Sequence, residues 1–539
     1  MSNRYRLYNY FLIFLGVTCG LLFAIYNPHK FPIDDGFFYL KIAQNILLYG
    51  QSSFHNITNT NGYHPLWQFI CILITNISSE EPDDLLRTVF IVQTFIFSAS
   101  LYLVHKISKI FKINEFIPMG ILTIIFIGKG SFYLMETFIV LFFLLLCINI
   151  YSNYLIKRES NNSPKIFFIT SILSSLLVFS RLDLIFFVSL FLGVVCLSEL
   201  KKDGFKKSAF RLTLLILPLF LLLFLYMYLN YYNFGIFFPI SGLIKSYDLL
   251  SFSFDRLGIL GIIILILLIF SASIIFLRKL RFKKFRKNLE NIEKILLLLL
   301  ASNLIFIIYI TLYIDAAPWY FVLAYVYFAF FVSYIIQIFC LVYYNFHFFD
   351  KLVLFLIIIL IFISISFSFL RAITNFSIFN KFYYNGSLST QIQTISGRYK
   401  LAKELENFLE PGTSILVFDT PGILAFYTRF NIFPSDGLMN DARYSFELID
   451  EGALNYFCKR NVNYVLAPMP SKFNPVFHGL HISLEKRLYN IKLTIYSPIL
   501  KKPSKPILLN SKNLTKVFDN PLNSINKNFQ SLGLWKFLC

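Results

Sequence analysis

Apolar runs of about 20 residues recur along most of this chain, and a run of that length crosses the hydrocarbon of a bilayer as one helix. The chain is 57% hydrophobic and only 14% charged, whereas soluble proteins are about 25% charged. A soluble fold is therefore excluded, and a polytopic α-helical membrane protein is predicted. The predicted spans are 9–26, 85–105, 115–127, 134–155, 166–180, 184–199, 211–230, 257–277, 294–313, 319–343 and 351–370.

The basic residues predict the orientation of these spans. Segment 63–78 is short and begins with Pro65 and Trp67, so we expect it to lie in the outer interface without crossing. With that choice, 22 Lys and Arg fall on one side of the membrane and seven on the other up to residue 370. Because basic loops stay cytoplasmic, the N-terminus is predicted inside and the C-terminus outside. The net charge of +20 is thereby explained without a nucleic-acid partner; the partners expected are membrane lipids.

The composition changes near residue 371, where Pro, Asn, Gly and charge return. We predict a membrane domain over 1–370, with a first outer loop at 27–84, and an extracytoplasmic α/β domain over 371–539. The expected elements of this second domain are helices at 398–409, 421–427 and 443–460 and strands at 415–418 and 464–467, with only short β segments beyond about 470. Cys458 and Cys539 lie in polar surroundings where a disulfide is conceivable, and their pairing is left open.

Two adjacent carboxylates follow the first span directly. Asp34 and Asp35 precede an amphipathic stretch, residues 37–47, that we expect to lie on the membrane surface. Like charges side by side next to low-dielectric lipid raise one another's pKa, which suits one of them to act as a general base or both to bind a metal. A solvated pair at the end of a helix is the structural alternative.

Further polar residues collect on the same predicted side. His64 and Trp67 lie in a turn-rich stretch, where an imidazole and an indole can orient a polar ligand or stack on a sugar ring; a structural turn with an interfacial Trp is equally consistent. Arg181 and Asp183 are also consistent with an internal ion pair. The other residues predicted to face this side are Glu136, Lys245, Asp315, Trp319 and Tyr320.

A family resemblance rests on the order of several motifs. These are "DDGFFYLKIAQN", "TNGYHPLW", "FYLMET", "SRLDL", "FGIFFPISGLIK", "DAAPWYF" and, in the tail, "PSDGLMN". The series resembles bacterial membrane glycosyltransferases of the GT-C fold that use polyprenyl-phosphate sugars, related to the arabinosyl, mannosyl and aminoarabinose transferases. The resemblance implies about eleven transmembrane helices followed by a soluble α/β domain, in a bacterial inner membrane with that domain in the periplasm.

The resemblance also implies roles for single residues. It makes Asp34 the catalytic base, with Asp35 beside it, and places Lys245 at the lipid phosphate after Pro239. The usual Pro-Asn-Thr is Pro-Ile-Ser in this chain. In the tail, Asp436 resembles a residue that offers a hydrogen bond to the membrane-domain cavity, although Asp also commonly caps a turn.

The expected activity is an inverting transfer of a sugar from a polyprenyl-phosphate donor to a glycan, lipid or protein acceptor. Asp34 would accept the proton of the attacking hydroxyl, while Arg181 and Lys245 would stabilise the departing phosphate. The alternatives are an oligosaccharide polymerase or ligase, and a flippase or transporter of lipid-linked sugars. No cofactor is required by the sequence; a divalent metal ion on Asp34, Asp35, Glu136 and His64 is left open.

Overall fold

The structure is a computed structural model. It describes residues 3–26, 28–128, 133–156, 163–246, 252–281, 286–314, 316–342, 395–417, 421–451 and 453–470, isolated positions between 356 and 363, and the strands that follow residue 481. The predicted span 351–370 lies mostly outside these described residues, as does Asp315.

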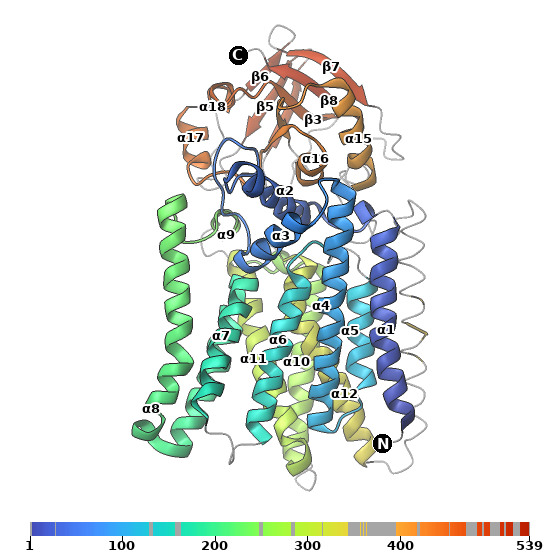
Figure 1. Ribbon diagram of the computed structural model, residues 1–539, viewed down its shortest axis with the longest axis vertical. Helices are drawn as coiled ribbons and strands as arrows, with labels where there is room; N and C mark the ends of the chain where they lie inside the picture. Colours follow the sequence, from blue (N-terminus) through green and yellow to red (C-terminus); the bar gives the residue numbers. More distant parts are fainter. Residues whose placement is uncertain are drawn as a thin grey trace.

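Long helices run side by side and form a bundle, with the N-terminus at the end that is farther from the strands (Figure 1). These helices are α1 (Asn3–Ile25), α4 (Pro82–Phe111), α5 (Phe116–Gly128), α6 (Thr137–Ile156), α7 (Pro164–Ser180), α8 (Ile185–Phe234), α10 (Gly258–Arg281), α11 (Arg286–Tyr313) and α12 (Val322–Val342). Proline occupies the first turn of α4 and α7, where its missing N–H costs nothing.

The helices coincide with the predicted spans wherever the structure describes them. Among the described residues, six segments are long and apolar enough to cross a membrane by length and composition, while α1, α5 and α7 contain shorter apolar stretches. α8 covers two predicted spans, 184–199 and 211–230. It consists of two helical parts joined at Gly204, where the backbone leaves the helical conformation with a φ of 74°. Such a positive φ suits glycine, which has no Cβ to clash. The number of crossings stays a prediction.

Short helices cover one end of this bundle. They are η1 (Pro28–Lys30), α2 (Asp34–Tyr49), α3 (Pro65–Ile77), η3 (Leu182–Leu184), α9 (Ile240–Ser246), η4 (Phe254–Leu257) and η6 (Pro318–Phe321). Figure 1 shows α2 and α3 at this end, which we call the covered end. α3 covers most of segment 63–78, and that this segment does not cross the membrane stays a prediction. The expectation that 37–47 lies on the membrane surface needs correction, because Phe37, Phe38 and Leu40 are buried and α2 packs beneath the C-terminal residues.

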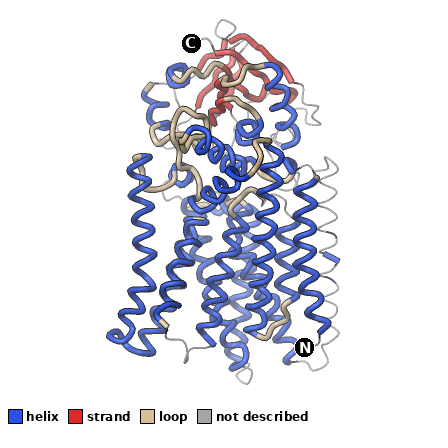
Figure 2. The backbone as a smooth tube through the Cα atoms, in the orientation of Figure 1, coloured by secondary structure: helices blue, strands red, loops and turns tan. Residues whose placement is uncertain are grey.

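The C-terminal residues form an α/β layer on the covered end (Figure 2). Its elements are α15 (Ile395–Phe408), β1 (Ser414–Val417), α16 (Pro421–Tyr427), β2 (Asn431–Pro434), α17 (Tyr444–Asp450), α18 (Ala453–Lys459), β3 (Tyr464–Pro470), β4 (Ile482–Arg487), β5 (Asn490–Ile495), β6 (Ile507–Asn510), β7 (Leu514–Asn520) and β8 (Phe529–Phe537). The predicted helix 443–460 is wrong as one element, since it divides into α17 and α18; the other elements predicted for this region are confirmed within a few residues.

Two sheets make up the β part of this layer. The first has the strand order β2-β1-β3-β8-β7, and β1 pairs in parallel with both β2 and β3. β8 pairs antiparallel with β3 and β7. The second sheet is antiparallel in the order β4-β5-β6. The connection from β1 to β2 runs through α16, and this helix contacts α2 of the bundle end.

The layer is joined to the bundle end by polar and aromatic contacts. The Tyr427 hydroxyl donates a hydrogen bond of 2.7 Å to Asp83, and the ring of His29 stacks on Tyr399 with 4.1 Å between the centroids. Burial lowers the pKa of His29 to about 4, so its ring is neutral and stacks without a buried charge at neutral pH. These contacts hold the α/β layer against the loops that carry the predicted site.

Candidate functional site

A small cavity lies at the covered end, between the first loop, the bundle and the α/β layer. Its volume is about 50 Å³, and it brings together side chains from six separate segments of the chain. The lining residues are Asp35, Phe38, Tyr39, Gly62, Tyr63, His64, Met135, Glu136, Ser241, Lys245, Trp319, Tyr320, Leu438 and Met439. Six of the predicted site residues therefore meet here: Asp35, His64, Glu136, Lys245, Trp319 and Tyr320.

Two carboxylates lie on the acidic side of this cavity. Glu136 is 2% exposed, and one of its oxygens accepts a 3.2 Å hydrogen bond from the Tyr39 hydroxyl. His64 Nε2 lies 3.7 Å from the other oxygen, and burial lowers the pKa of His64 to about 3, so this imidazole is neutral. Burial is also the largest effect on Asp35; it raises the pKa of that carboxyl, with Lys245 opposing and Glu136 adding to the rise. A carboxylate with a raised pKa is suited to accept a proton.

Lys245 supplies the cation of the cavity. It lies in the last turn of α9, and its Nζ is 3.5 Å from the Tyr320 hydroxyl. Tyr320 raises the pKa of Lys245, burial acts in the opposite sense, and Asp35 and Glu136 raise it further. The net effect is a rise, so Lys245 is charged at neutral pH. The cavity thus places an ammonium group in the field of two carboxylates.

Arg181 acts behind the cavity and does not line it. Its Nε and Nη2 donate to one oxygen of Asp183 at 3.1 and 2.9 Å, and its Nη1 donates to the carbonyl of Trp319 at 2.6 Å. The guanidinium carbon also lies 4.0 Å from the centre of the Tyr320 ring. The expectation that Arg181 faces the substrate is corrected, because the N–H groups of its guanidinium already donate to Asp183 and to Trp319. Arg181, oriented by its ion pair with Asp183, holds the Trp319–Tyr320 segment in place.

Trp67 also has a supporting position. Its side chain is completely buried, and its indole N–H donates a 2.7 Å hydrogen bond to the carbonyl of Leu134. Gln93 holds the same loop, accepting from the Leu134 N–H and donating to the Met135 carbonyl. Trp67 therefore cannot stack on a sugar in this arrangement; with Gln93, which the sequence did not single out, it fixes the turn that presents Glu136.

Asp34 points to the α/β layer. Its two carboxylate oxygens accept the backbone N–H groups of Gly422 at 2.8 Å and Ile423 at 2.9 Å, in the first turn of α16. A Cβ at Gly422 would lie 2.4 Å from the Asp34 carbonyl oxygen, so only glycine allows this approach. Asp34 does not line the cavity, whereas Asp35 does. The geometry thus does not support the prediction that Asp34 faces the substrate.

Asp436 caps a turn and does not reach the cavity. Its Oδ1 accepts the N–H of Leu438 at 2.9 Å, and Gly437 has a φ of 77°, the left-handed conformation that glycine adopts without strain. The geometry therefore favours the alternative interpretation of Asp436, in which it caps a turn and does not bind substrate. The turn delivers the next two residues, Leu438 and Met439, to the cavity wall.

The predicted metal ligands do not form a cluster. Over the residues that the structure describes, no group of three or more His, Cys, Asp or Glu side chains is placed to hold a metal ion. Asp34 is bound to α16, and His64 and Glu136 form a close pair. The residues present therefore do not fit a metal site built from the four candidates.

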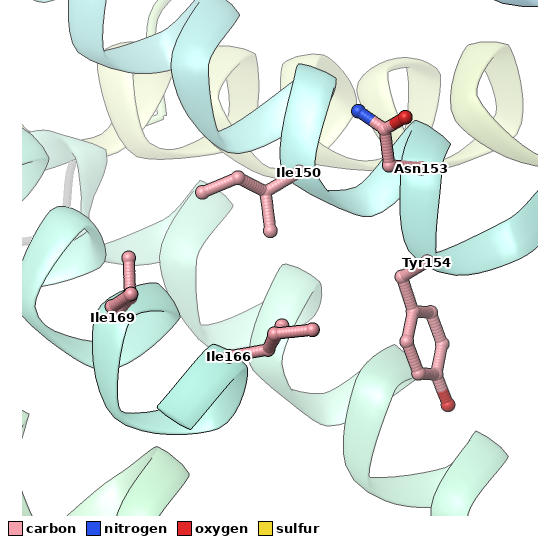
Figure 3. A pocket seen from close by; sticks show the side chains of 5 residues that line it. All are labelled: Ile150, Asn153, Tyr154, Ile166 and Ile169. Atoms are coloured by element: carbon pink, nitrogen blue, oxygen red, sulfur yellow. The ribbon is translucent and has the colours of Figure 1, made fainter. Parts of the chain in front are cut away.

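A second cavity, of about 200 Å³, lies between α6 and α7 (Figure 3). Its lining is largely aliphatic and consists of Ile150, Asn153, Tyr154, Ile166 and Ile169. The Asn153 amide donates to the Asn149 carbonyl, and the Tyr154 hydroxyl donates to Glu199. Its polar groups are thus committed to the protein, and this cavity offers no reactive group comparable to Asp35 or Lys245.

The long apolar helices among the described residues indicate a multi-pass membrane protein. No protein-family model and no curated protein matches the sequence. Two solved structures of the Archaeoglobus fulgidus oligosaccharyltransferase are similar to the chain: the apo form has a TM-score of 0.44 at 14% identity, covering 85% of this chain and 69% of that one. The form with zinc and sulfate has a TM-score of 0.42 at 13% identity, covering 85% and 68%. At this level of likeness, the activity has to be inferred from the site residues.

Proposed function

We propose that this protein is a membrane glycosyltransferase that moves a sugar from a polyprenyl-phosphate donor to a hydroxyl of an acceptor. The observation that carries the proposal is the meeting of Asp35, Glu136 and Lys245 in one cavity at the end of an apolar helix bundle. At this level a lipid donor has its hydrocarbon tail beside the helices and its phosphate near the lysine.

The proposed reaction is a single displacement with inversion. The acceptor oxygen attacks the anomeric carbon, and its proton passes to the Asp35 carboxylate. The bond between that carbon and the phosphate oxygen breaks, and its electron pair remains on the phosphate, whose negative charge Lys245 stabilises. We assign the base to Asp35 and not to Asp34, because the oxygens of Asp34 accept two backbone N–H groups.

Two observations support placing the site on the outer face. Basic residues are concentrated in the loops at the opposite end of the predicted spans, and such loops stay cytoplasmic. In the α/β layer, Cys458 is disulfide-bonded, and disulfides persist in oxidising compartments. Both favour an extracytoplasmic α/β domain, and in a bacterium the compartment would be the periplasm.

The test uses the full-length protein in lipid nanodiscs with labelled polyprenyl-phosphate mannose, arabinose and aminoarabinose. Release of polyprenyl phosphate and transfer of the label are expected with one of these donors, and Asp35→Asn should reduce turnover by about 10²–10⁴, the usual scale for a lost general base. Asp84→Asn is a matched control, since Asp84 pairs with Arg87 on the exposed surface. Movement of the donor across the bilayer without release, or transfer only of a preassembled glycan, would contradict the proposal.

A further inference from the structure

The position of Lys245 depends on a short segment between α8 and the cavity. α8 ends at Phe234 and is capped by Gly235, whose φ is 72°, and α9 begins at Ile240. Phe237 and Phe238 lie in this connection and are 48% and 53% exposed, so their side chains do not anchor it in the core. Pro239 is buried and Ile236 packs against Ile240 and Ile244, so the connection has an apolar anchor to which hydrogen bonds of its backbone are added.

Asn61 and Asn230 bind the backbone of this connection. Asn61 Oδ1 accepts the N–H of Ile240 at 3.0 Å, and its Nδ2 lies 3.4 Å from the carbonyl oxygen of Phe238. The same Nδ2 lies 3.3 Å from Asn230 Oδ1, and Asn230 Nδ2 lies 3.4 Å from the carbonyl oxygen of Phe237. Three backbone groups in four residues are thus paired with two buried amides, which are 2% and 5% exposed.

Apolar packing holds α9 as well. Ile240 and Ile244 are buried, and they pack with Leu438 and Ala442 of the α/β layer. These apolar contacts are not directional, whereas the hydrogen bond to Ile240 fixes where the helix begins. From Ile240 to Lys245 the helix rises about 7.5 Å, at 1.5 Å per residue, so a shift at its start is carried to the ammonium group.

We propose that Asn61 is a positioning residue for Lys245. Together with Asn230, it joins the first loop to the α8–α9 connection and sets the place at which Lys245 meets the donor phosphate. This inference rests on the proposed function, and it assigns to Asn61 a role that acts through Lys245 and not through contact with the substrate.

The experiment compares Asn61→Ala, Lys245→Ala and the double variant in donor titrations of the full-length protein. Asn61→Ala should raise the KM for the donor about tenfold, the effect of losing one to two buried hydrogen bonds, with a smaller change in kcat. Because Asn61 acts through Lys245, the double variant should be no worse than Lys245→Ala alone.

Asn233→Ala is the matched control, because Asn233 lies on α8 as Asn230 does, is exposed, and donates only to the Leu229 carbonyl among the contacts described. If Asn61→Ala does not fold, Asn230→Ala should raise the donor KM less but in the same direction. An unchanged donor KM in Asn61→Ala, or losses that multiply in the double variant, would overturn the positioning role. An unchanged donor KM in Lys245→Ala would instead contradict the proposed function itself.

Discussion

The Asp34 carboxylate accepts the backbone N–H of Ile423 at 2.9 Å, across 389 positions of the chain. The next residue, Asp35, lines the cavity. Two adjacent carboxylates are therefore directed to different tasks: one holds the first turn of α16, and the other is half-buried and lines the cavity together with Lys245 and Glu136. Asp34 therefore contributes to the stability of the covered end, and Asp35 is the residue available for the proposed chemistry.

Substitution of the two aspartates should separate these tasks. Asp35→Asn should leave the thermal midpoint nearly unchanged and abolish most turnover. Asp34→Asn has one acceptor oxygen instead of two, so one N–H of α16 loses its partner, at a cost of about 1–3 kcal/mol. We expect Asp34→Asn to lower the midpoint and to speed limited proteolysis of the α/β layer, with a smaller loss of turnover. The opposite pattern would return the base assignment to Asp34.

The pH profile should report the charges around Asp35. Its pKa is raised by burial, and a base acts only when ionised, so kcat/KM should fall as pH decreases through that raised pKa. Glu136→Gln removes a negative charge that raises this pKa, and the acid limb should move to lower pH. Lys245→Ala removes a positive charge that lowers it, and the limb should move to higher pH. An acid limb that stays in place in both variants would exclude Asp35 as the titrating group.

Gly62 sets how closely the α/β layer approaches the cavity. A Cβ at this residue would lie 2.2 Å from the Leu438 carbonyl oxygen, so Gly62→Ala must displace backbone of the layer. We expect a loss of kcat/KM of about five- to 150-fold, which corresponds to a cost of about 1–3 kcal/mol for overpacking, measured with saturating acceptor. Gly193→Ala is the control, because a Cβ there meets nothing within 4 Å. Equal activity of the two variants would show that this contact is dispensable.

The predicted orientation can be tested by labelling introduced cysteines in intact cells. Arg443 in the α/β layer and Lys206 at the far end of the bundle are both exposed. A membrane-impermeant maleimide should label Arg443→Cys from outside, and it should label Lys206→Cys only after the membrane is permeabilised. If Lys206→Cys alone is labelled in intact cells, the predicted orientation is wrong and the reverse one holds.

Three residues that we expected at the substrate have structural roles instead, and the sequence alone could not reveal this. Trp67, Arg181 and Asp436 are polar or aromatic residues in the predicted outer loops, and we expected all three at the substrate. In the structure Trp67 binds Leu134, Arg181 binds Trp319, and Asp436 caps its own turn. The first two contacts join residues far apart in the chain, and nothing in the local sequence reveals them.

The sequence by itself determined the apolar helices and the gathering of polar residues at one end, because hydropathy and turn residues act over neighbouring positions. Only the tertiary structure decided which of those polar residues share a cavity. Asp34 and Asp35 are chemically identical and adjacent, and the difference between them arises from α16, which binds Asp34 and leaves Asp35 to the cavity. The physical reason is that side-chain direction depends on contacts made after the distant segments have packed.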